Sequence, residues 1–182
     1  MDLNKNIHLF VSLACLCILS FSISHVVCSP FAGKPVLDPV LLKICGATEN
    51  PTLCANSVLP LLHGPVDLVN VLKSEIDATI KEASIILKQI TKMNNTATSK
   101  EVKSALESCQ QMYRDAIDNL KETKTFAEAR NAVDVINKLS GVASCYSTCD
   151  DSFADFQLQS PLNTQNFNWF IQILLSLGNL LK

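Results

Sequence analysis

The sequence is poor in the residues that interrupt regular structure and in net charge. It contains only five glycines and seven prolines among 182 residues, too few for a turn-rich all-β fold or a disordered chain. Fifteen basic residues against seventeen acidic ones leave a formal net charge of −2. Nothing in this balance resembles the basic surface of a protein that binds nucleic acid or an anionic membrane, and we expect neither partner.

Residues that catalysis requires are also scarce. After residue 28 the only histidine is His63, beside Gly64-Pro65 in a predicted turn, so any Ser–His or Cys–His system would depend on an exposed loop residue. Asp150 and Asp151 are adjacent on a predicted helix and point in different directions, as on a solvated helix edge. There is no phosphate-binding glycine loop or nucleotide fingerprint. We predict that the protein is not an enzyme and has no cofactor.

Residues 1–28 have the pattern of a secretory signal peptide. A short start containing Lys5 precedes an almost wholly apolar run from Leu9 to Val27, followed by small residues. We predict cleavage after Cys28, with cleavage after Ser24 as the alternative. A membrane anchor is the weaker interpretation, because polar residues interrupt the run and no basic flank follows it. We therefore expect secretion, with no stable membrane association after cleavage.

Five cysteines remain in the predicted mature domain, residues 29–182. An odd number in an oxidising compartment implies two disulfides and one free thiol. No zinc or other metal site is predicted, because Cys145-x3-Cys149 has no second pair at finger spacing. Cys145 and Cys149 lie one helical turn apart and could both compete for Cys109, so the residues alone leave the pairing open. The five are Cys45, Cys54, Cys109, Cys145 and Cys149.

Two short helices are predicted at the start of the mature domain. They span about 40–45 and 52–62, on either side of the turn at Asn50-Pro51, and each contains one cysteine. Asp38-Pro39 is a suitable N-cap followed by proline in the first turn. This arrangement is typical of a disulfide-stapled helical hairpin, which we place at about 38–64.

Four longer amphipathic stripes follow, with apolar residues at steps of three and four. The first starts near Val69 and is broken at 93–99, the second starts near Lys100, and the third starts near Phe126. Thr164 could cap the fourth. The fold class expected is all-α: an antiparallel up-down four-helix bundle over about 66–182, preceded by the hairpin.

A single glycosylation sequon lies in the expected break between the first two long helices. It reads Asn94-Asn95-Thr96, and a break between helices is accessible to modification in the secretory pathway. We predict glycosylation at Asn94, with an unoccupied site as the alternative.

Three sequence blocks occur in order on these predicted helices. Cys45 to Cys54 reads Cys-Gly-Ala-Thr-Glu-Asn-Pro-Thr-Leu-Cys, and Cys109 is followed by Tyr four, Ala seven and Leu eleven residues later. The third block, Thr148 to Phe153, reads Thr-Cys-Asp-Asp-Ser-Phe. In these blocks the chain resembles the plant invertase and pectin methylesterase inhibitors, over essentially the whole mature domain. Ser140-Gly141-Val142 departs slightly from the Ser-Ala-Ala of that family.

The resemblance implies the same bundle-plus-hairpin fold and a defined cysteine pairing. Cys45 would pair with Cys54 within the hairpin, and Cys109 with Cys149 between the second and third bundle helices. Cys145 matches no paired family position and is left as the free thiol. A buried, inert thiol is the first interpretation of Cys145, and pairing between chains is the alternative.

The family has two kinds of target. Its invertase inhibitors carry a Pro-Lys-Phe loop, and the corresponding stretch here, near 132–135, lacks it. Lys124-Thr125-Phe126 lies about nine residues too early and has no proline. The segments 115–118 and 148–153 look closer to the pectin methylesterase inhibitors. Pectin methylesterase is therefore the favoured partner, with acid invertase as the alternative and a non-inhibitory secreted helical protein as the third possibility.

The resemblance also implies a steric mechanism, in which bundle helices cover the substrate cleft of the enzyme in a one-to-one complex. On the second bundle helix, Gln111, Asp115 and Asp118 share an outward stripe, and we predict that they contact the partner. Ordinary solvated positions are the alternative interpretation. We expect an apoplastic protein that is a monomer or a weak dimer, since the hairpin could pack on its own bundle or on that of a second molecule.

Overall fold

The computed structural model describes residues 38–182, and the predicted signal peptide and the leader after it lie outside this range. Every element in 38–182 is helical, which confirms the all-α fold class. No helix within these residues combines the length and apolar character needed to cross a membrane. The elements are α2 (Pro39–Cys45), α3 (Pro51–Val58), the 3₁₀-helix η1 (Leu59–Leu61), α4 (Leu68–Thr96), α5 (Lys100–Glu128), α6 (Ala132–Ala154) and α7 (Gln165–Asn179).

Side-chain caps mark where most of the helices begin. Each capping oxygen accepts a hydrogen bond from a backbone N–H of the first turn, which would otherwise have no partner. Thr164 precedes α7 but makes no such bond. Its hydroxyl lies 3.4 Å from Tyr146 Oη instead, so the expected cap is not formed there. The capping residues are Asp38, Asn50, Asp67, Ser99 and Asn131.

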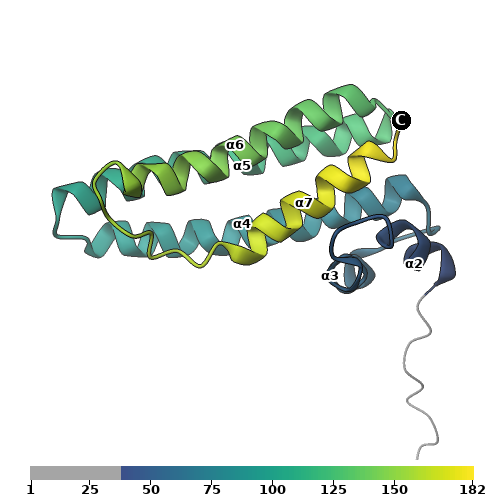
Figure 1. Cartoon of the computed structure of the whole chain (residues 1–182), viewed down its shortest axis with the longest axis horizontal. Coiled ribbons are helices and arrows are strands. Elements are labelled where there is room, and N and C mark those ends of the chain that lie inside the picture. The colour runs from purple at the N-terminus through teal and green to yellow at the C-terminus, as the bar shows by residue number, and fades with distance from the viewer. Residues whose placement is uncertain (1–37) are drawn as a thin grey trace, which may run out of the picture. The chain divides into compact units, whose positions relative to one another are not determined.

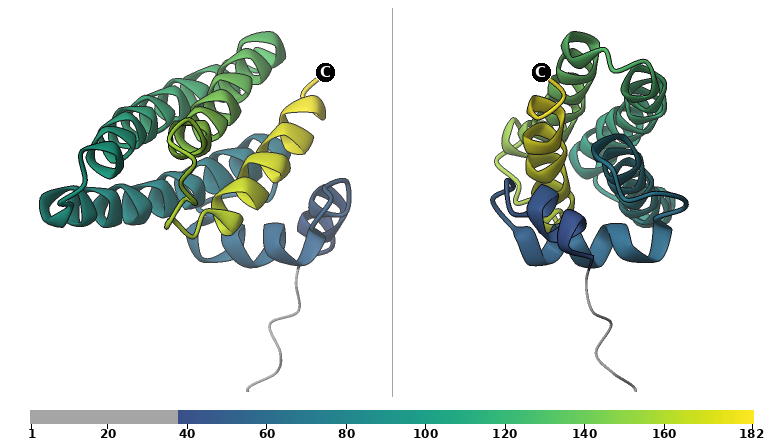
Figure 2. Two further views of the ribbon diagram at one scale, coloured as in Figure 1. Left: turned by 60° about the vertical axis from the view of Figure 1, so that its left-hand side comes forward. Right: turned by 90° about the vertical axis from the view of Figure 1, so that its right-hand side faces the viewer.

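The four long helices pack as an antiparallel ring. α4 contacts α5 and α7, and α6 contacts the same two helices. Figure 1 shows α5 and α6 side by side along most of their length, whereas α7 runs obliquely across the bundle. The two short connections, 97–99 and 129–131, force neighbouring helices to run in opposite directions, and the longer segment 155–164 returns the chain to α7. The views in Figure 2 show the same arrangement from the side.

The apolar stripes meet in one continuous core. Tyr113 and Phe167 are both buried in it, with ring centroids 5.2 Å apart. Burial of each large apolar side chain in such a core contributes about 1.5–3 kcal/mol. The other large side chains that are fully buried include Leu72, Ile76, Ile86, Ile90, Leu106, Leu120, Leu139, Phe153 and Ile171.

A glycine sets the distance between α7 and α6. A Cβ atom at Gly178 would lie 3.0 Å from Ile136 Cδ1 and 3.1 Å from Val135 Cγ1. Contacts this short occur rarely between real side chains, and overpacking of a dense core is destabilising. The absence of a side chain at this position therefore lets α7, which carries no charged residue, approach α6 closely.

Two predicted helix boundaries are wrong. The third bundle helix does not start near Phe126, because α5 continues to Glu128 and α6 begins at Ala132. Arg130 ends α5 in the left-handed conformation, with φ 54°, and Asn131 N–H donates to the Phe126 carbonyl at 2.9 Å. This is a helix-terminating turn that usually contains glycine.

The predicted break at 93–99 is shorter than expected. Helix α4 continues through Asn94 to Thr96, and the Thr96 hydroxyl donates to main-chain carbonyls of the preceding turn at 3.1 and 3.3 Å. The connection to α5 therefore consists of residues 97–99 alone.

The N-terminal hairpin is closed by a disulfide and packs on its own bundle. Cys45 and Cys54 are bonded and fully buried, with Cα atoms 5.6 Å apart. The hairpin contacts α4, mainly through α3 and η1. Leu41 and Val58 are fully buried, so the hairpin shares the continuous core of the bundle.

The second disulfide should contribute more to stability than the first. The Cys109–Cys149 bond closes a loop of 40 residues and Cys45–Cys54 one of 9 residues. Loop-closure entropy gives about 4 kcal/mol for the longer loop and about 2.5 kcal/mol for the shorter. We expect the double substitution C109A/C149A to lower the free energy of unfolding more than C45A/C54A does. Urea denaturation followed by circular dichroism measures both, and the reverse order would contradict the entropic account.

Candidate interaction surface

The pair formed by α5 and α6 is the most rigidly connected part of the bundle. Cys109 and Cys149 are bonded, with Cα atoms only 4.4 Å apart, and both are buried. Nearby, the hydroxyl oxygens of Ser108, next to Cys109, and Ser152, one turn after Cys149, lie 2.7 Å apart and share a hydrogen bond. A covalent bond beside a polar contact fixes the register of the two helices, so side chains on their outer side keep fixed relative positions.

The three residues predicted to contact a partner lie together on the outer side of α5. Gln111 and Asp118 are exposed and Asp115 is half-buried, while Tyr113 and Leu120 of the same helix face the core. Gln111 Nε2 donates to Asp115 Oδ1 at 2.8 Å, and Lys121 Nζ donates to Asp118 Oδ1 at 2.8 Å. Gln111 and Asp115 therefore form a hydrogen-bonded pair, whereas Asp118 is held by Lys121.

Helix α6 contributes the other half of this surface. Lys138 Nζ forms an ion pair with Glu122 of α5 at 2.5 Å and lies 3.5 Å from Asn119 Oδ1. At Gly141 a Cβ atom would lie 3.4 Å from Asn119 Nδ2, an ordinary contact distance, so Asn119 of α5 lies beside this part of α6. Together with the α5 stripe these groups form a polar surface, which we call the α5–α6 face: Gln111, Asp115, Asp118, Glu122, Lys138 and Cys145.

Cys145 is the free thiol of the described residues, and it is half-buried rather than fully buried. Desolvation raises the pKa of this thiol, and the Asp115 carboxylate raises it further because a second negative charge nearby is unfavourable. The Asp115 carboxylate on α5 is therefore near enough to the Cys145 thiol on α6 to influence its charge. The thiol is mostly protonated near neutral pH, when it is a poor nucleophile.

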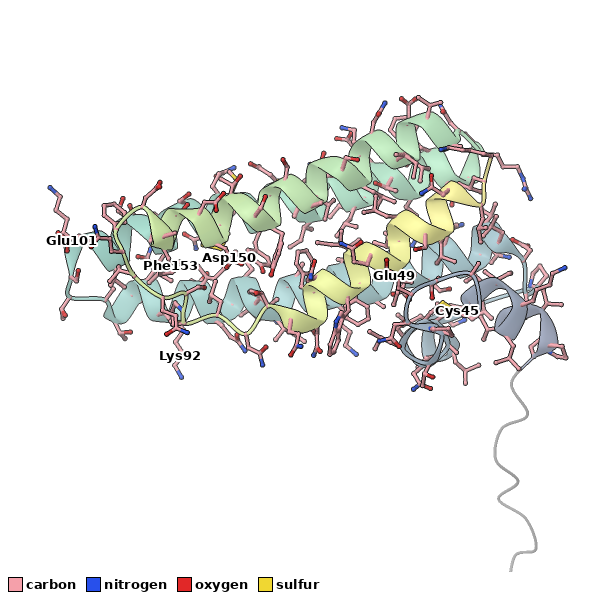
Figure 3. All side chains as sticks on the ribbon, viewed as in Figure 1. Cys45, Glu49, Lys92, Glu101, Asp150 and Phe153 are labelled. Atoms are coloured by element: carbon pink, nitrogen blue, oxygen red, sulfur yellow. A yellow bond between two sulfur atoms is a disulfide. The ribbon has the colours of Figure 1, made fainter. Side chains whose placement is uncertain are left out.

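The acidic residues at the end of α6 do not form a carboxylate pair. Asp151 is exposed, and Asp150, which Figure 3 labels on α6, is half-buried. Burial raises the pKa of Tyr113 well above its ordinary value, and the negative charge of Asp150 raises it further. The Tyr113 hydroxyl is buried and has no hydrogen-bond partner within residues 38–182. We assign no chemistry to it.

A charged hollow between α4 and α5 was not expected from the sequence. Lys73 pairs with Glu128 at 2.5 Å and Lys124 with Asp77 at 2.7 Å, and exposed His63 lies at the edge of the same hollow. Both lysines are already paired with carboxylates. These ion pairs connect α4 to α5 and leave neither lysine free to bind a ligand. Within residues 38–182 no three His, Cys, Asp or Glu side chains lie close enough to hold a metal ion.

Two further sequence features are placed by the structure. Asn94 lies in the last turn of α4 and is half-buried, and its amide oxygen has no partner among the described residues; its glycosylation stays a prediction. The stretch 132–135, where an invertase-inhibiting loop was sought, forms the first turn of α6. Lys124 and Phe126 belong to α5.

The position of Asp115 can be tested through the reactivity of Cys145. We expect Asp115→Asn to increase the rate of Cys145 alkylation by iodoacetamide severalfold at neutral pH, because removing the carboxylate lowers the thiol pKa and raises the thiolate fraction. Mass spectrometry of the disulfide-intact protein measures the rate. Asp118→Asn, one turn further along α5, is the matched control and should leave the rate unchanged. Equal rates for D115N and the wild type would contradict the proximity of Asp115 and Cys145.

The chain is similar to a family of plant inhibitors and to two individual proteins. Residues 40–177 match the family described as "Plant invertase/pectin methylesterase inhibitor". The chain is 30% identical over 129 residues to a pectinesterase inhibitor of Actinidia deliciosa, covering 69% of this chain and 70% of that protein. It is 27% identical over 142 residues to pectinesterase inhibitor 2 of Arabidopsis thaliana, covering 76% and 82% of the two chains.

A solved structure has the same fold. The crystal structure of a mutant form of a pectin methylesterase inhibitor from Arabidopsis superimposes with a TM-score of 0.63. The alignment covers 78% of this chain and 97% of that one, at 23% sequence identity. At this identity the likeness establishes the shared helical architecture, including the short helices that precede the bundle.

Proposed function

Because this chain belongs to the plant invertase/pectin methylesterase inhibitor family, we propose that it is a secreted inhibitor of pectin methylesterase. It would cover the substrate cleft of the enzyme in a one-to-one complex. The family is one of inhibitors, so the chain is not an enzyme. The observation that carries the proposal is the α5–α6 face, a polar and mainly acidic surface on the two helices that a disulfide joins.

Rigidity makes the α5–α6 face suitable for docking. A surface whose side chains are already held in place loses little conformational entropy when a partner binds. Cys109–Cys149 fixes the two helices, and the bond from Gln111 to Asp115 orders the centre of the face. A cleft that binds a polar polysaccharide presents hydrogen-bonding groups, and such groups would meet this face without covering large apolar residues.

The charges of the face favour specificity more than affinity. Asp118 and Lys121 are largely exposed, with side-chain exposures of 68% and 62%, so their ion pair contributes at most about 1 kcal/mol. Asp115 accepts its bond from a neutral amide, and no ion pair to it is formed within residues 38–182. A hydrogen-bond donor on the partner enzyme could therefore bind the Asp115 carboxylate, as complementary groups do at an interface.

Acid invertase is the less favoured target. The Pro-Lys-Phe triplet of the invertase inhibitors is absent, and the corresponding residues are helical, with Asn131 capping Asp134 N at 3.2 Å. The curated relatives described above are named for pectinesterase rather than for invertase. A helical protein without inhibitory activity is the third candidate, and the same assay separates all three.

The environment of the protein is part of the proposal. Disulfides persist in oxidising compartments, and the two disulfides here support secretion to the apoplast, as the predicted signal peptide does. We also propose that the protein is a monomer or a weak dimer. Asn94 lies at the end of the bundle formed by the α4–α5 connection, away from the hairpin, and we propose it as the site of glycosylation.

The direct test is inhibition of purified plant pectin methylesterase and acid invertase, side by side, by the mature protein with its disulfides formed. We expect inhibition of the esterase alone. Inhibition of invertase alone would show that an inhibitor of this family can act on invertase without the Pro-Lys-Phe loop. A folded sample inactive against a panel of both enzymes would overturn the proposal in favour of a non-inhibitory protein.

The docking surface can be tested with charge-removing substitutions. We expect D115N/D118N to weaken inhibition of pectin methylesterase roughly tenfold or more, with most of the loss from Asp115, because a donor on the enzyme would lose its charged partner. Glu82→Gln on α4 is the matched control, since it removes a negative charge away from this face. Binding is measured by surface plasmon resonance and folding by circular dichroism. Equal affinities for D115N/D118N and E82Q would exclude the α5–α6 face as the contact surface.

A further inference from the structure

The hairpin meets the bundle at a buried polar contact, which we call the hairpin–bundle junction: Ser57, Leu61, Ser74 and Glu75. Ser74 Oγ donates to the Leu61 carbonyl at 3.3 Å. Ser57 Oγ lies 2.5 Å from Glu75 Oε2. The first contact connects α4 to η1 and the second connects α4 to α3, so both short helices of the hairpin's second half depend on adjacent residues of α4.

Glu75 is in an unusual environment for a carboxyl group. It is fully buried, with 0% of its surface exposed, and its second oxygen, Oε1, has no hydrogen-bond partner within residues 38–182. A buried carboxylate needs a cation or several donors to replace the water that it loses. One hydroxyl cannot supply this, so the site accommodates a neutral carboxylic acid and not a carboxylate.

The hydrogen bonds of Ser57 agree with a neutral Glu75. Besides Glu75, the Ser57 hydroxyl lies 2.9 Å from the Leu53 carbonyl and 3.0 Å from the Cys54 carbonyl. A serine hydroxyl has one proton to donate. If Glu75 is protonated, its O–H donates to Ser57 Oγ, and the serine proton remains available to a helix carbonyl. If Glu75 is ionised, Ser57 must donate to it, and the negative charge has a single hydrogen bond.

The neighbouring elements provide no counter-charge. Helix α3, η1 and α7 contain no charged residue, and Lys43, the one charged residue of α2, is exposed. On α4 itself, Lys81 and Glu82 border an open groove of about 360 Å³ that Ser57 also lines. The groove therefore opens the Ser57 and Leu61 side of the junction to the surface.

The remaining charged groups near the junction are engaged elsewhere. Lys73 and Asp77 of α4 pair with Glu128 and Lys124 of α5, and exposed His63 lies at the edge of their hollow. Burial raises the pKa of Glu75 from 4.5 to about 8, and the Ser57 hydrogen bond acts in the opposite direction.

We propose that the hairpin–bundle junction is a proton-dependent contact, in which neutral Glu75 keeps α3 and η1 packed on α4 and ionised Glu75 releases them. The direction of this pH dependence follows from the difference in proton binding between the closed and open forms. Between pH 4.5 and about 8 the closed junction holds a proton on Glu75, whereas an opened junction exposes an ionised carboxylate. The closed form is therefore fully stabilised below about pH 4.5 and loses this stability progressively as the pH rises from there to about 8.

The junction lies outside the α5–α6 face, so its test requires no target enzyme. Hydrogen exchange of the disulfide-intact mature protein would be followed by mass spectrometry from about pH 5.5 to 8.5, with intrinsic exchange rates corrected for pH. We expect protection of peptides covering 53–62 to fall about tenfold or more relative to peptides from the centre of α5, because opening exposes the carboxylate.

Two matched variants distinguish the effect of Glu75 titration from general effects of pH on hydrogen exchange. Glu75→Gln keeps the size and hydrogen-bonding capacity of the neutral acid, and its hairpin protection should not change with pH. Glu82→Gln, two turns along α4 and partly exposed, should behave as the wild type. Loss of protection in E75Q with the same pH dependence as the wild type would overturn the proposal.

A measurement on the wild type covers the case in which E75Q does not fold. Carboxyl carbon shifts from NMR should show one glutamate titrating far above 4.5, in the same pH range in which hairpin amide signals change. If all glutamates titrate near the ordinary value, or if the hairpin signals change in a different range, the junction is not controlled by Glu75.

Discussion

The close packing of α5 against α6 is the constraint on which the rest of this structure depends. The disulfide between Cys109 and Cys149 holds their Cα atoms 4.4 Å apart, and the inward side chains of the pair, among them Tyr113 and Leu139, form much of the core. Helices α4 and α7 complete the ring against this pair. Because the inner side of α5 and α6 is fixed by packing, their outer side becomes a surface of fixed geometry without further support.

This division of roles explains how one pair of helices can serve both stability and recognition. Inward positions of α5 are apolar and fully buried, whereas Gln111 and Asp118 on the outer side are exposed and free to vary without loss of core contacts. Substitutions on the outer side can therefore change the partner while the fold persists. Such a separation suits a family whose members act on two unrelated enzymes with one scaffold.

The sequence predicted the fold well because its apolar periodicity is unambiguous, and it predicted local detail less well. Leu106, Cys109, Tyr113 and Leu120 are all buried, as their spacing indicated. The end of α5 was missed because Arg130 adopts a left-handed conformation that glycine usually signals.

The candidate surface was predictable only in part. The spacing of Gln111, Asp115 and Asp118 identified the stripe on α5, but the facing residues of α6 depend on helix rotation, which no single stripe determines. Glu75 was missed for a different reason. A glutamate among apolar residues is ordinarily assigned to solvent, and its burial becomes visible only when the hairpin is placed over it. The site can therefore be recognised only from the packing of the hairpin on the bundle.

The two disulfides have a mechanical consequence. Each bond closes a loop within one part of the molecule, the hairpin or the bundle, and neither crosses between them. Under a force applied to the N-terminal end, the hairpin would peel away from α4 while both covalent loops stayed intact. The hairpin is thus joined to the bundle only by noncovalent contacts and by the chain itself, and the Cys109–Cys149 bond would keep α5 and α6 together after the hairpin had separated.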